Sequence, residues 1–445
     1  MKLSEITATL REIGVSPVRS LGQNFLHDRN LARWIIDQAE ISENDYVLEI
    51  GPGLGALTEL ALERYAHVLA IEKDKRLADF LRARFRSSSL EIAHADALEF
   101  DPRSLYTRPK VKLLGNLPYY IASQLLIKFL NYPSPISLWV LMLQKELAKR
   151  LVAAPRTKDY GALTLQIQLH YRVEYLRTVP ASVFLPKPDV DSALVRITPR
   201  SPPDLPSCDY NVFEQLVKRG FSQRRKQLGK LIREKVLDWE NVAGELGLNM
   251  RARAEELSLE QWIALTNRVA PVAPELTEYS SEERFSVVDE QDQVTGAAPR
   301  GQVHGNNLLH RAVHILIFNP AGEVFLQLRS RWKDRHPLRW DSSAAGHVCA
   351  DEEYDQAAIR ELREELGIDI PLAKVAKLTA SQRTDHEFVW LYSGVHSDEP
   401  KPNPQEIEAA AFFPPTIVDG WIQARPGEFA PTFIECWKIW REKNP

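Results

Sequence analysis

The sequence predicts an α/β protein with a parallel β-sheet in its N-terminal half and a second α/β unit in its C-terminal third. In the N-terminal half, apolar runs of strand length alternate with helical patterns, and the first run leads into a glycine-rich turn at 51–55. In the C-terminal third, alternating strand patterns at 312–318 and 324–329 precede a glutamate-rich helical pattern at 360–366. Such alternation is typical of sheets that helices cover.

Length and composition are those of an ordinary globular chain. The 445 residues correspond to roughly three domains, and 44% of them are apolar and 26% charged. The longest apolar run, 136–143, is far shorter than the ~20 residues of a membrane span, and the N-terminus lacks the apolar core of a signal peptide. Three widely spaced cysteines give neither a disulfide framework nor a zinc-binding pattern. We therefore expect a monomeric cytoplasmic protein that does not bind membranes.

Charge is unevenly distributed along the chain. Residues 1–270 contain 38 basic and 32 acidic side chains, whereas residues 271–445 contain 18 and 28. The basic excess suits contact with a phosphate backbone, and the acidic excess suits metal binding. Solvated surfaces alone would also explain both.

The glycine turn predicts a ligand site. Residues 45–50 form a short apolar run, residues 51–55 read GPGLG, and helical periodicity follows. Strand, glycine turn and helix form the context of a nucleotide-type loop, because glycine lets the backbone approach a ligand closely. The turn lacks the further glycine of dinucleotide-binding loops, so we expect a nucleoside with a small charged tail rather than a pyrophosphate.

Polar residues follow the next predicted strands. Glu72 ends the second strand, where an acid is placed to bind a ribose diol. Asp96 follows the third strand, where its carboxylate could accept from an adenine amino group, and Asn116 follows the fourth. Singly, each has an ordinary explanation as a tight turn or a helix cap. Together with Gly51, they predict one binding site at the carboxyl edge of a parallel sheet.

The stretch 115–120, GNLPYY, predicts methyl transfer to a nitrogen atom. The side-chain oxygen of Asn116 and the carbonyl of Pro118 can each accept an N–H from a planar amine, and Tyr119 can stack on a base. Phe184 begins a loop that two prolines hold extended. It could close over a flipped base from the other face, or it could be a core residue that anchors this loop.

These motifs resemble, in order, those of the small-subunit ribosomal RNA adenine dimethyltransferases, which use S-adenosylmethionine. The resemblance covers roughly residues 1–268 and rests on SLGQNFLHD, VLEIGPGLGALT, ADAL, GNLPYY, QKELAKRL and FLPKPDVDSALV. It implies a Rossmann-like methyltransferase fold in which Asn24 and Leu26 help to enclose the cofactor, Gly51 lies under its methionine part, Glu72 holds the ribose and Asp96 the adenine.

The same resemblance implies that Asn116, Pro118 and Tyr119 grip the target amine while Phe184 stacks on the target base. The large-subunit methyltransferases of macrolide resistance share most of this layout. They usually have Ile where this chain has Leu117, so the small-subunit branch is the closer likeness.

A small helical domain is predicted for residues 201–269, after a first domain at 1–200. Its cluster Arg224, Arg225 and Lys226 is a candidate contact for the RNA backbone, or else a solvated helix face. The resemblance continues through this part and favours RNA. Residues 270–282 then predict a linker to a third domain at 283–445.

The third domain contains a motif with the spacing of the Nudix box, from Gly346 to a glycine that ends the helix at 367. Glu361, Glu364 and Glu365 lie at i, i+3 and i+4 and therefore share one helix face. Three carboxylates on one face repel each other unless a hard cation lies among them, which predicts Mg²⁺ or Mn²⁺. An ordinary charged surface helix is the alternative. Arg360 can orient one glutamate by a charged hydrogen bond.

Resemblance to the Nudix hydrolases implies an α/β/α sandwich that cleaves a diphosphate linked to another group. It implies Glu361 and Glu365 as first metal ligands, Glu364 as the next, and assistance from the Gly346 carbonyl, with Glu364 and Glu365 in the catalytic step. Residues 288–319 also look like the subgroup that includes isopentenyl-diphosphate isomerase. That isomerase needs a cysteine where residues 342–347 read SSAAGH, and Cys349 lies in the wrong place, so we expect hydrolysis.

Together, the two resemblances imply two enzymes in one chain. The first dimethylates N6 of two adjacent adenosines in the ribosomal RNA of an immature small subunit, and the second hydrolyses a small-molecule diphosphate. Three alternatives stay open: a non-catalytic ribosome-assembly factor, a large-subunit methyltransferase, and a Nudix domain that only binds its ligand.

Overall fold

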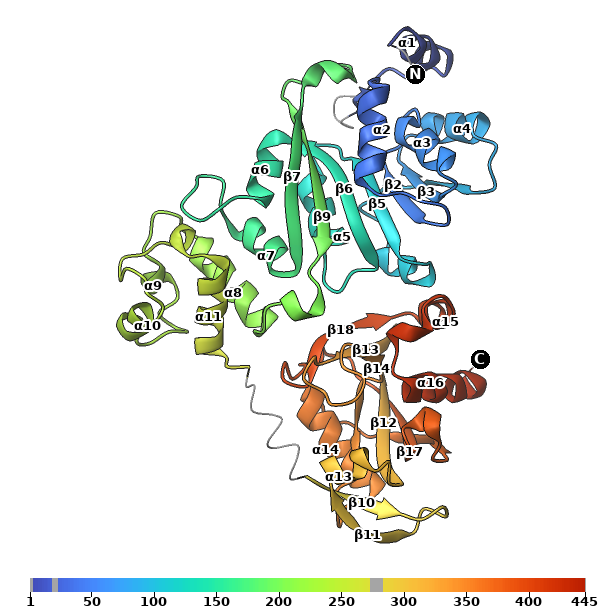
Figure 1. The fold of residues 1–445 in the computed structure, drawn as a ribbon, viewed down its shortest axis with the longest axis vertical. Helices are drawn as coiled ribbons and strands as arrows, with labels where there is room; N and C mark the ends of the chain where they lie inside the picture. Colours follow the sequence, from blue (N-terminus) through green and yellow to red (C-terminus); the bar gives the residue numbers. More distant parts are fainter. Residues whose placement is uncertain (1–2, 18–22, 273–282, 445) are drawn as a thin grey trace. The chain divides into compact units, whose positions relative to one another are not determined.

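The computed structural model describes residues 3–17, 23–272 and 283–444 (Figure 1). The chain divides into two compact units, Met1–Pro271 and Val272–Pro445. The first residues of the SLGQNFLHD motif and most of the predicted linker lie outside the described residues. Each unit is described by itself.

A seven-stranded sheet forms the centre of the first unit, in the order β4-β3-β2-β5-β6-β9-β7. The first five strands in this order are parallel, and β9 is antiparallel to both β6 and β7. The bounds of these strands are β2 Tyr46–Ile50, β3 His67–Glu72, β4 Leu90–His94, β5 Val111–Asn116, β6 Ile136–Gln144, β7 Tyr171–Val179 and β9 Ser192–Pro199. The predicted strands therefore form one sheet whose carboxyl edge carries the polar residues.

Helices cover both faces of this sheet. One hydrophobic core packs α5, α6 and α7 against the sheet, and a second core packs α2 and α3 against the opposite face. The bounds of the helices in this part are α1 Leu3–Glu12, α2 Arg29–Gln38, α3 Ala56–Glu63, α4 Lys75–Arg84, α5 Ala122–Phe129, α6 Lys145–Leu151 and α7 Ala162–His170. This three-layer arrangement confirms the predicted Rossmann-like fold.

A two-stranded sheet joins distant parts of the first unit. Strand β1 (Phe25–Leu26) pairs antiparallel with β8 (Phe184–Leu185), so that Leu26 lies opposite Phe184. The N-terminal motif and the proline-rich loop thereby meet, although no local sequence signal links them.

A helical part completes the first unit. It consists of α8 (Tyr210–Phe221), α9 (Leu228–Leu231), α10 (Trp239–Glu245) and α11 (Leu259–Val269). Its core includes Trp262 and shares Tyr160 with the segment before α7. The Tyr160 hydroxyl also donates to the Leu257 carbonyl at 2.8 Å. Residues 222–227 form turns between α8 and α9.

The second unit is built around β12 (His310–Phe318). This strand is antiparallel to β13 (Val324–Arg329) and β15 (Ala344–His347) and parallel to β17 (Glu387–Val395). The remaining strands of this nine-stranded sheet are β10 Arg284–Val288, β11 Val294–Pro299, β14 Trp340–Asp341, β16 Ala373–Leu378 and β18 Ile407–Phe413.

Helices lie on both sides of β12, as a Nudix sandwich requires. Val313 and Ile315 pack against α14 (Tyr354–Leu366). Alternate residues of a strand face opposite sides, and Phe318 stacks on Trp440 of α16 (Pro431–Lys443). Among the described residues of this unit, the other α-helices are α13 Arg300–Gly305 and α15 Pro415–Ala424. Within the described parts of the chain, no helix combines the length and hydropathy of a membrane span.

Candidate functional site

A cavity lies at the carboxyl edge of the parallel sheet in the first unit. It is lined by most of the residues that the sequence predicted for a nucleoside cofactor and its target amine, namely Asn24, Gly51, Glu72, Asp96, Asn116 and Pro118. Leu26 does not line it and is buried in the core behind it. The structure therefore brings the strand-end residues together.

Glu72 is held by the backbone of the glycine turn. Its carboxylate accepts the Gly53 amide at 3.2 Å and the Asp74 amide at 2.9 Å. Burial raises its pKa, although these amide hydrogen bonds act in the opposite direction. The turn can come this close because Gly53 has a φ of +57°, a conformation that suits glycine.

Asp96 is paired with Lys73, a residue that the sequence analysis did not single out. Lys73 Nζ lies 2.6 Å from Asp96 Oδ2, and the Leu98 amide donates to Asp96 Oδ1 at 2.9 Å. The hydrogen bond from Lys73 and the amide of Leu98 hold the pKa of Asp96 below its usual value. The carboxylate is therefore an ionised acceptor at neutral pH.

The amide group of Asn116 has one defined orientation. Its Nδ2 donates to the Asn24 carbonyl at 2.9 Å, so the side-chain oxygen is left as an acceptor. The neighbouring Pro118 carbonyl accepts the Ile121 amide at 3.1 Å and keeps a second lone pair.

The two predicted aromatic residues lie outside this cavity. Tyr119 is half-buried and its hydroxyl hydrogen-bonds the Ser192 hydroxyl at 2.6 Å. Phe184 is only 3% exposed and belongs to the core that includes α2 and α3. In this arrangement, Phe184 packs as a core residue that anchors the loop after it.

The basic cluster of the helical part has two kinds of member. Arg224 donates to the Lys158 carbonyl at 2.7 Å and lies 3.2 Å from Glu255 Oε2, so it fastens neighbouring segments together. Arg225 and Lys226 are exposed. Arg224 is exposed as well, but its contacts also give it a role in local structure.

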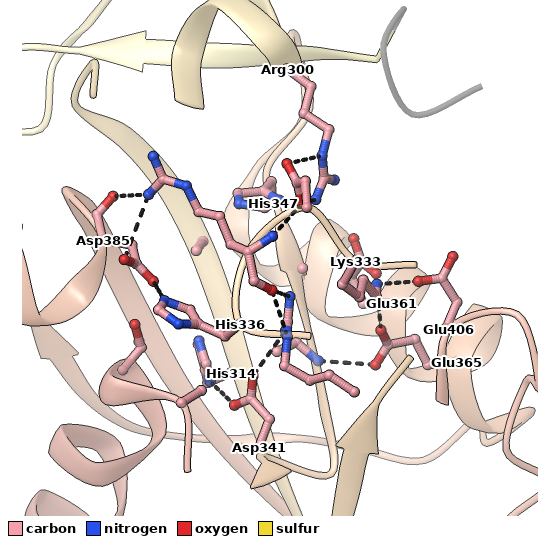
Figure 2. Close-up of a pocket in the computed structure, with 18 of the residues that line it drawn as sticks. Arg300, His314, Lys333, His336, Asp341, His347, Glu361, Glu365, Asp385 and Glu406 are labelled. Carbon is pink, nitrogen blue, oxygen red and sulfur yellow. Dashed lines mark hydrogen bonds and ion pairs between the residues drawn. The ribbon is translucent and has the colours of Figure 1, made fainter. Parts of the chain in front are cut away.

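The second unit contains a cavity of about 580 Å³ beside the glutamate-rich helix α14 (Figure 2). Glu361 and Glu365 line it and are only 8% and 3% exposed, whereas the Glu364 side chain is 57% exposed. A Cβ atom on Gly346 would stand 2.0 Å from the Glu361 carboxylate. The strand and the helix can therefore approach this closely only with glycine at this position.

The two buried carboxylates suit a divalent cation. Burial raises the pKa of both Glu361 and Glu365, because desolvation disfavours their charged forms. Glu365 Oε2 accepts from Gln327 Nε2 at 2.9 Å and from the Ala345 amide at 3.1 Å. The side-chain oxygen of Gln327, Oε1, is buried and has no hydrogen-bond partner among the described residues. A hard cation would offset the repulsion between these oxygens, so the residues fit Mg²⁺ or Mn²⁺.

Arg360 braces the acidic face of α14. It donates to Glu352 Oε1 at 2.9 Å, to Glu361 Oε1 at 2.8 Å and to Glu364 Oε2 at 3.0 Å. It also donates to the His347 carbonyl at 2.9 Å. This one guanidinium therefore ties the helix to the loop that follows Gly346.

Basic side chains also line this cavity. They are Arg300, Arg329, Lys333, Arg335 and His336. Lys333 pairs with Glu406 and lies 3.7 Å from Glu365 Oε1. A cavity that contains both basic side chains and carboxylates suits a ligand that carries phosphates and a metal.

Sequence reasoning missed one group of side chains in this unit. These are His304, His310, His347 and Glu387, and one nitrogen or oxygen atom from each lies within 4.8 Å of the other three. Burial lowers the pKa of His347 well below its usual value, so this ring is neutral at pH 7. The four residues come from α13, β12, β15 and β17, and no local spacing pattern connects them. The histidine after Gly346 was the one signal available.

Comparison with known proteins gives two family matches. Residues 17–271 match the family described as ribosomal RNA adenine dimethylase, and residues 308–433 match the NUDIX domain. The chain is 39% identical over 279 residues to ribosomal RNA small subunit methyltransferase A of Geobacillus kaustophilus, an alignment that covers 59% of this chain and 94% of that protein. It is 42% identical over 254 residues to the protein of the same name from Prosthecochloris aestuarii, with coverages of 57% and 94%.

Among solved structures, a dimethyladenosine transferase from Plasmodium falciparum is 26% identical to this chain. The match covers 54% of this chain and 95% of that one, with a TM-score of 0.46.

Proposed function

The chain belongs to the ribosomal RNA adenine dimethylase family and also contains a Nudix domain, and from this premise we propose that it combines two activities. The first is dimethylation of N6 on two adjacent adenosines in small-subunit ribosomal RNA. The second is metal-dependent hydrolysis of a small-molecule diphosphate. The substrate of the first activity would be an immature small subunit in the cytoplasm, and the chain would act as a monomer.

The orientation of Asn116 is the observation that carries the methyltransferase proposal. Its NH₂ group is engaged by the Asn24 carbonyl, which leaves its oxygen to accept one N6–H of adenine. The Pro118 carbonyl would accept the other. Two acceptors favour a pyramidal nitrogen whose lone pair is no longer delocalised into the ring.

S-adenosylmethionine would supply the methyl group on its sulfonium. Glu72 would hold the ribose of this cofactor and Asp96 its adenine, with Gly51 beneath the methionine part. The residues of this site supply positioning and electrostatics, and no strong base is required because the methylated amine loses its proton readily to water. The target base must be unstacked first, at a cost of a few kcal/mol.

Tyr119 is the aromatic residue that we assign to the target base, next to Asn116 and Pro118. Phe184 is a second candidate, but its burial means that the loop 184–192 would have to rearrange before the ring could stack on a base. Arg225 and Lys226, which are exposed, are the proposed contacts for the RNA backbone, and Arg224 would support them.

Labelled methyl transfer to immature small subunits tests the first activity. The full chain should transfer methyl groups to adenines of the small-subunit RNA, and Asn116→Ala should abolish this while the protein still binds the cofactor. A chain that binds small subunits but transfers no methyl group would be an assembly factor instead. Transfer to large-subunit RNA would favour the other branch of methyltransferases.

The buried pair Glu361 and Glu365 carries the proposal for the second activity. Together with the Gly346 carbonyl they would hold a divalent cation, which polarises phosphoryl oxygens and lowers the pKa of a bound water. Glu364, exposed at the edge of the cavity, would accept the proton of the attacking water. Arg300 and Lys333 would bind phosphate oxygens.

A panel of diphosphate metabolites tests the second activity. We expect Mg²⁺- or Mn²⁺-dependent release of phosphate products from at least one compound, abolished in Glu365→Ala. Tight binding of a diphosphate without turnover would instead indicate a Nudix domain that only binds.

A further inference from the structure

The hydroxyl group of Tyr119 is tied to the central sheet of the first unit. It lies 2.6 Å from the hydroxyl oxygen of Ser192, the first residue of β9, and either oxygen can be the donor. Ser192 is completely buried and lies between Gln144 of β6 and Val179 of β7 in the sheet. A buried residue at this position cannot move far without disturbing its neighbours, so Ser192 is a rigid anchor for the half-buried Tyr119 ring.

Two further contacts bring other sequence motifs to the same point. The Asp191 carbonyl accepts the Lys145 amide at 3.1 Å, where α6 begins. The Asp191 carboxylate accepts the Ala181 amide at 3.1 Å, in the short helical turn before Phe184. The segments QKELAKRL, FLPKPDVDSALV and GNLPYY therefore meet at residues 191–192, although they are far apart in the sequence.

The hydrogen bond to Ser192 also restrains the carbonyl of Pro118. Before this residue, the Leu117 amide donates to the Met142 carbonyl of β6 at 3.1 Å. The ring of Pro118 fixes its φ angle, so the main freedom that remains is rotation of the peptide plane between Pro118 and Tyr119. Because a tyrosine hydroxyl lies on the long axis of its ring, the bond to Ser192 restrains the direction of this axis and, through it, the backbone at Tyr119. Ser192 therefore positions both an aromatic face and one of the two acceptors for the target amine.

We propose that Ser192 is a positioning residue for the target adenine and that it matters most for the second methyl transfer. This role rests on the proposed methyltransferase function. In each transfer the N6 lone pair forms a nitrogen–carbon bond, the carbon–sulfur bond of the donor breaks with its electron pair left on sulfur, and one N6 proton passes to water. An unmodified amine presents two N–H groups to the two acceptors. A monomethylated amine presents only one, so contact with the Tyr119 ring must supply more of the positioning.

Two single variants break the bond from its two sides. Ser192→Ala removes the anchor, and Tyr119→Phe removes the hydroxyl but retains the aromatic ring. In each, kcat for methyl transfer to immature small subunits should fall by about tenfold to a hundredfold, because small displacements of a reacting group cost this much. KM for S-adenosylmethionine should not change. The double variant should be no slower than the slower single variant, since both substitutions break the same bond. Monomethyladenosine, measured by mass spectrometry of the digested RNA, should accumulate in both single variants.

The chain contains a matched control for these substitutions. Tyr175 and Thr178 form a tyrosine–hydroxyl hydrogen bond of 2.8 Å within β7, and both side chains are half-buried. Neither residue lines the cofactor cavity. Tyr175→Phe and Thr178→Ala should therefore keep the wild-type kcat and the wild-type ratio of monomethyl to dimethyl product. Thermal melting of every variant shows whether it is folded.

A fluorine signal tests the anchor without turnover. In protein that carries 3-fluorotyrosine, the resonance of Tyr119 is identified by its absence in Tyr119→Phe. This resonance should shift or broaden in Ser192→Ala and stay unchanged in Thr178→Ala. An unchanged resonance in Ser192→Ala would show that Ser192 does not hold the ring, and the proposal would be wrong.

The kinetic outcomes separate this role from the proposed function. The proposal is wrong if folded Ser192→Ala keeps the wild-type kcat and product ratio, or if the effects of the two substitutions multiply in the double variant. A lower melting temperature with unchanged kcat would mean that Ser192 only stabilises the fold. A fall in kcat without accumulation of monomethyladenosine would overturn the special role in the second transfer. A wild type that binds small subunits but transfers no methyl group would overturn the proposed function, and the role of Ser192 with it.

Discussion

Lys73 Nζ lies 2.6 Å from Asp96 Oδ2 at the edge of the cavity in the first unit. The lysine side chain is 51% exposed, so the pair contributes little to folding. The pair instead keeps Asp96 ionised, because the hydrogen bond from Lys73 is the largest cause that lowers the pKa of this carboxyl group.

The first prediction follows from this pair. In Lys73→Met, the pKa of Asp96 should rise toward its ordinary value, so cofactor affinity should begin to fall at a higher pH than in the wild type when the solution is acidified. Calorimetric titration with S-adenosylmethionine across mildly acidic pH measures the shift. Identical pH profiles for the two proteins would show that Lys73 does not control the pKa of Asp96.

Glu72→Ala should weaken S-adenosylmethionine binding by about tenfold to a hundredfold. A hydrogen bond to a charged group contributes about 1.5–3 kcal/mol, and 1.4 kcal/mol is tenfold in affinity. Glu91→Ala is the control, because Glu91 lies on the neighbouring strand β4 with its side chain 63% exposed. Calorimetry that gives equal affinities for Glu72→Ala and the control would contradict the assignment of Glu72 to the ribose.

Sequence reasoning correctly predicted which residues lie together where their positions follow from local order. Gly51, Glu72, Asp96 and Asn116 each lie at or just after the end of a strand, and parallel strands bring their carboxyl ends to one edge. The spacing in α14 likewise determined which glutamates share a face. In these cases, the position of a residue along its own strand or helix was sufficient to predict which other residues it lies beside.

Sequence reasoning was incomplete where the position of a side chain depends on contacts between segments that are distant in the sequence. Phe184 is buried because β8 pairs with β1, and no sequence motif predicts this pairing. Arg224 is engaged by the segment around Lys158, so its charge is not simply presented to RNA. His310 and Glu387 meet only because β12 and β17 are parallel neighbours in register.

Gly346→Ala should disrupt the second cavity. The added methyl group would stand 2.0 Å from the Glu361 carboxylate, and overpacking of this kind costs about 1–3 kcal/mol or displaces the side chain. Gly301→Ala is a matched control, since Gly301 lines the same cavity and its added Cβ would meet nothing within 4 Å. We expect Gly346→Ala to lose metal-dependent hydrolysis while Gly301→Ala retains it. Equal activities would show that Glu361 is free to move aside.

Glu49 predicts a pH-dependent stability for the first unit. It is buried in β2, accepts the Thr58 hydroxyl at 2.6 Å, and burial raises its pKa to about 7. In the unfolded chain an ordinary glutamate titrates near pH 4.3, so between this pH and 7 the folded state binds more protons than the unfolded state. The contribution of Glu49 to the free energy of unfolding must therefore decrease as the pH rises through this window.

The variant Glu49→Gln isolates this contribution, because an uncharged amide can still accept from Thr58 and all other titrating groups are shared. Relative to the variant, the wild type should lose on the order of 3 kcal/mol between pH 4 and pH 8, since one pKa unit corresponds to about 1.4 kcal/mol. Calorimetric unfolding of both proteins at a series of pH values measures the difference. Glu91→Gln, at an exposed site, should behave as the wild type does. A difference that stays constant with pH, or that grows in favour of the wild type, would mean that Glu49 is ionised in the folded protein at the same pH as in the unfolded chain or lower.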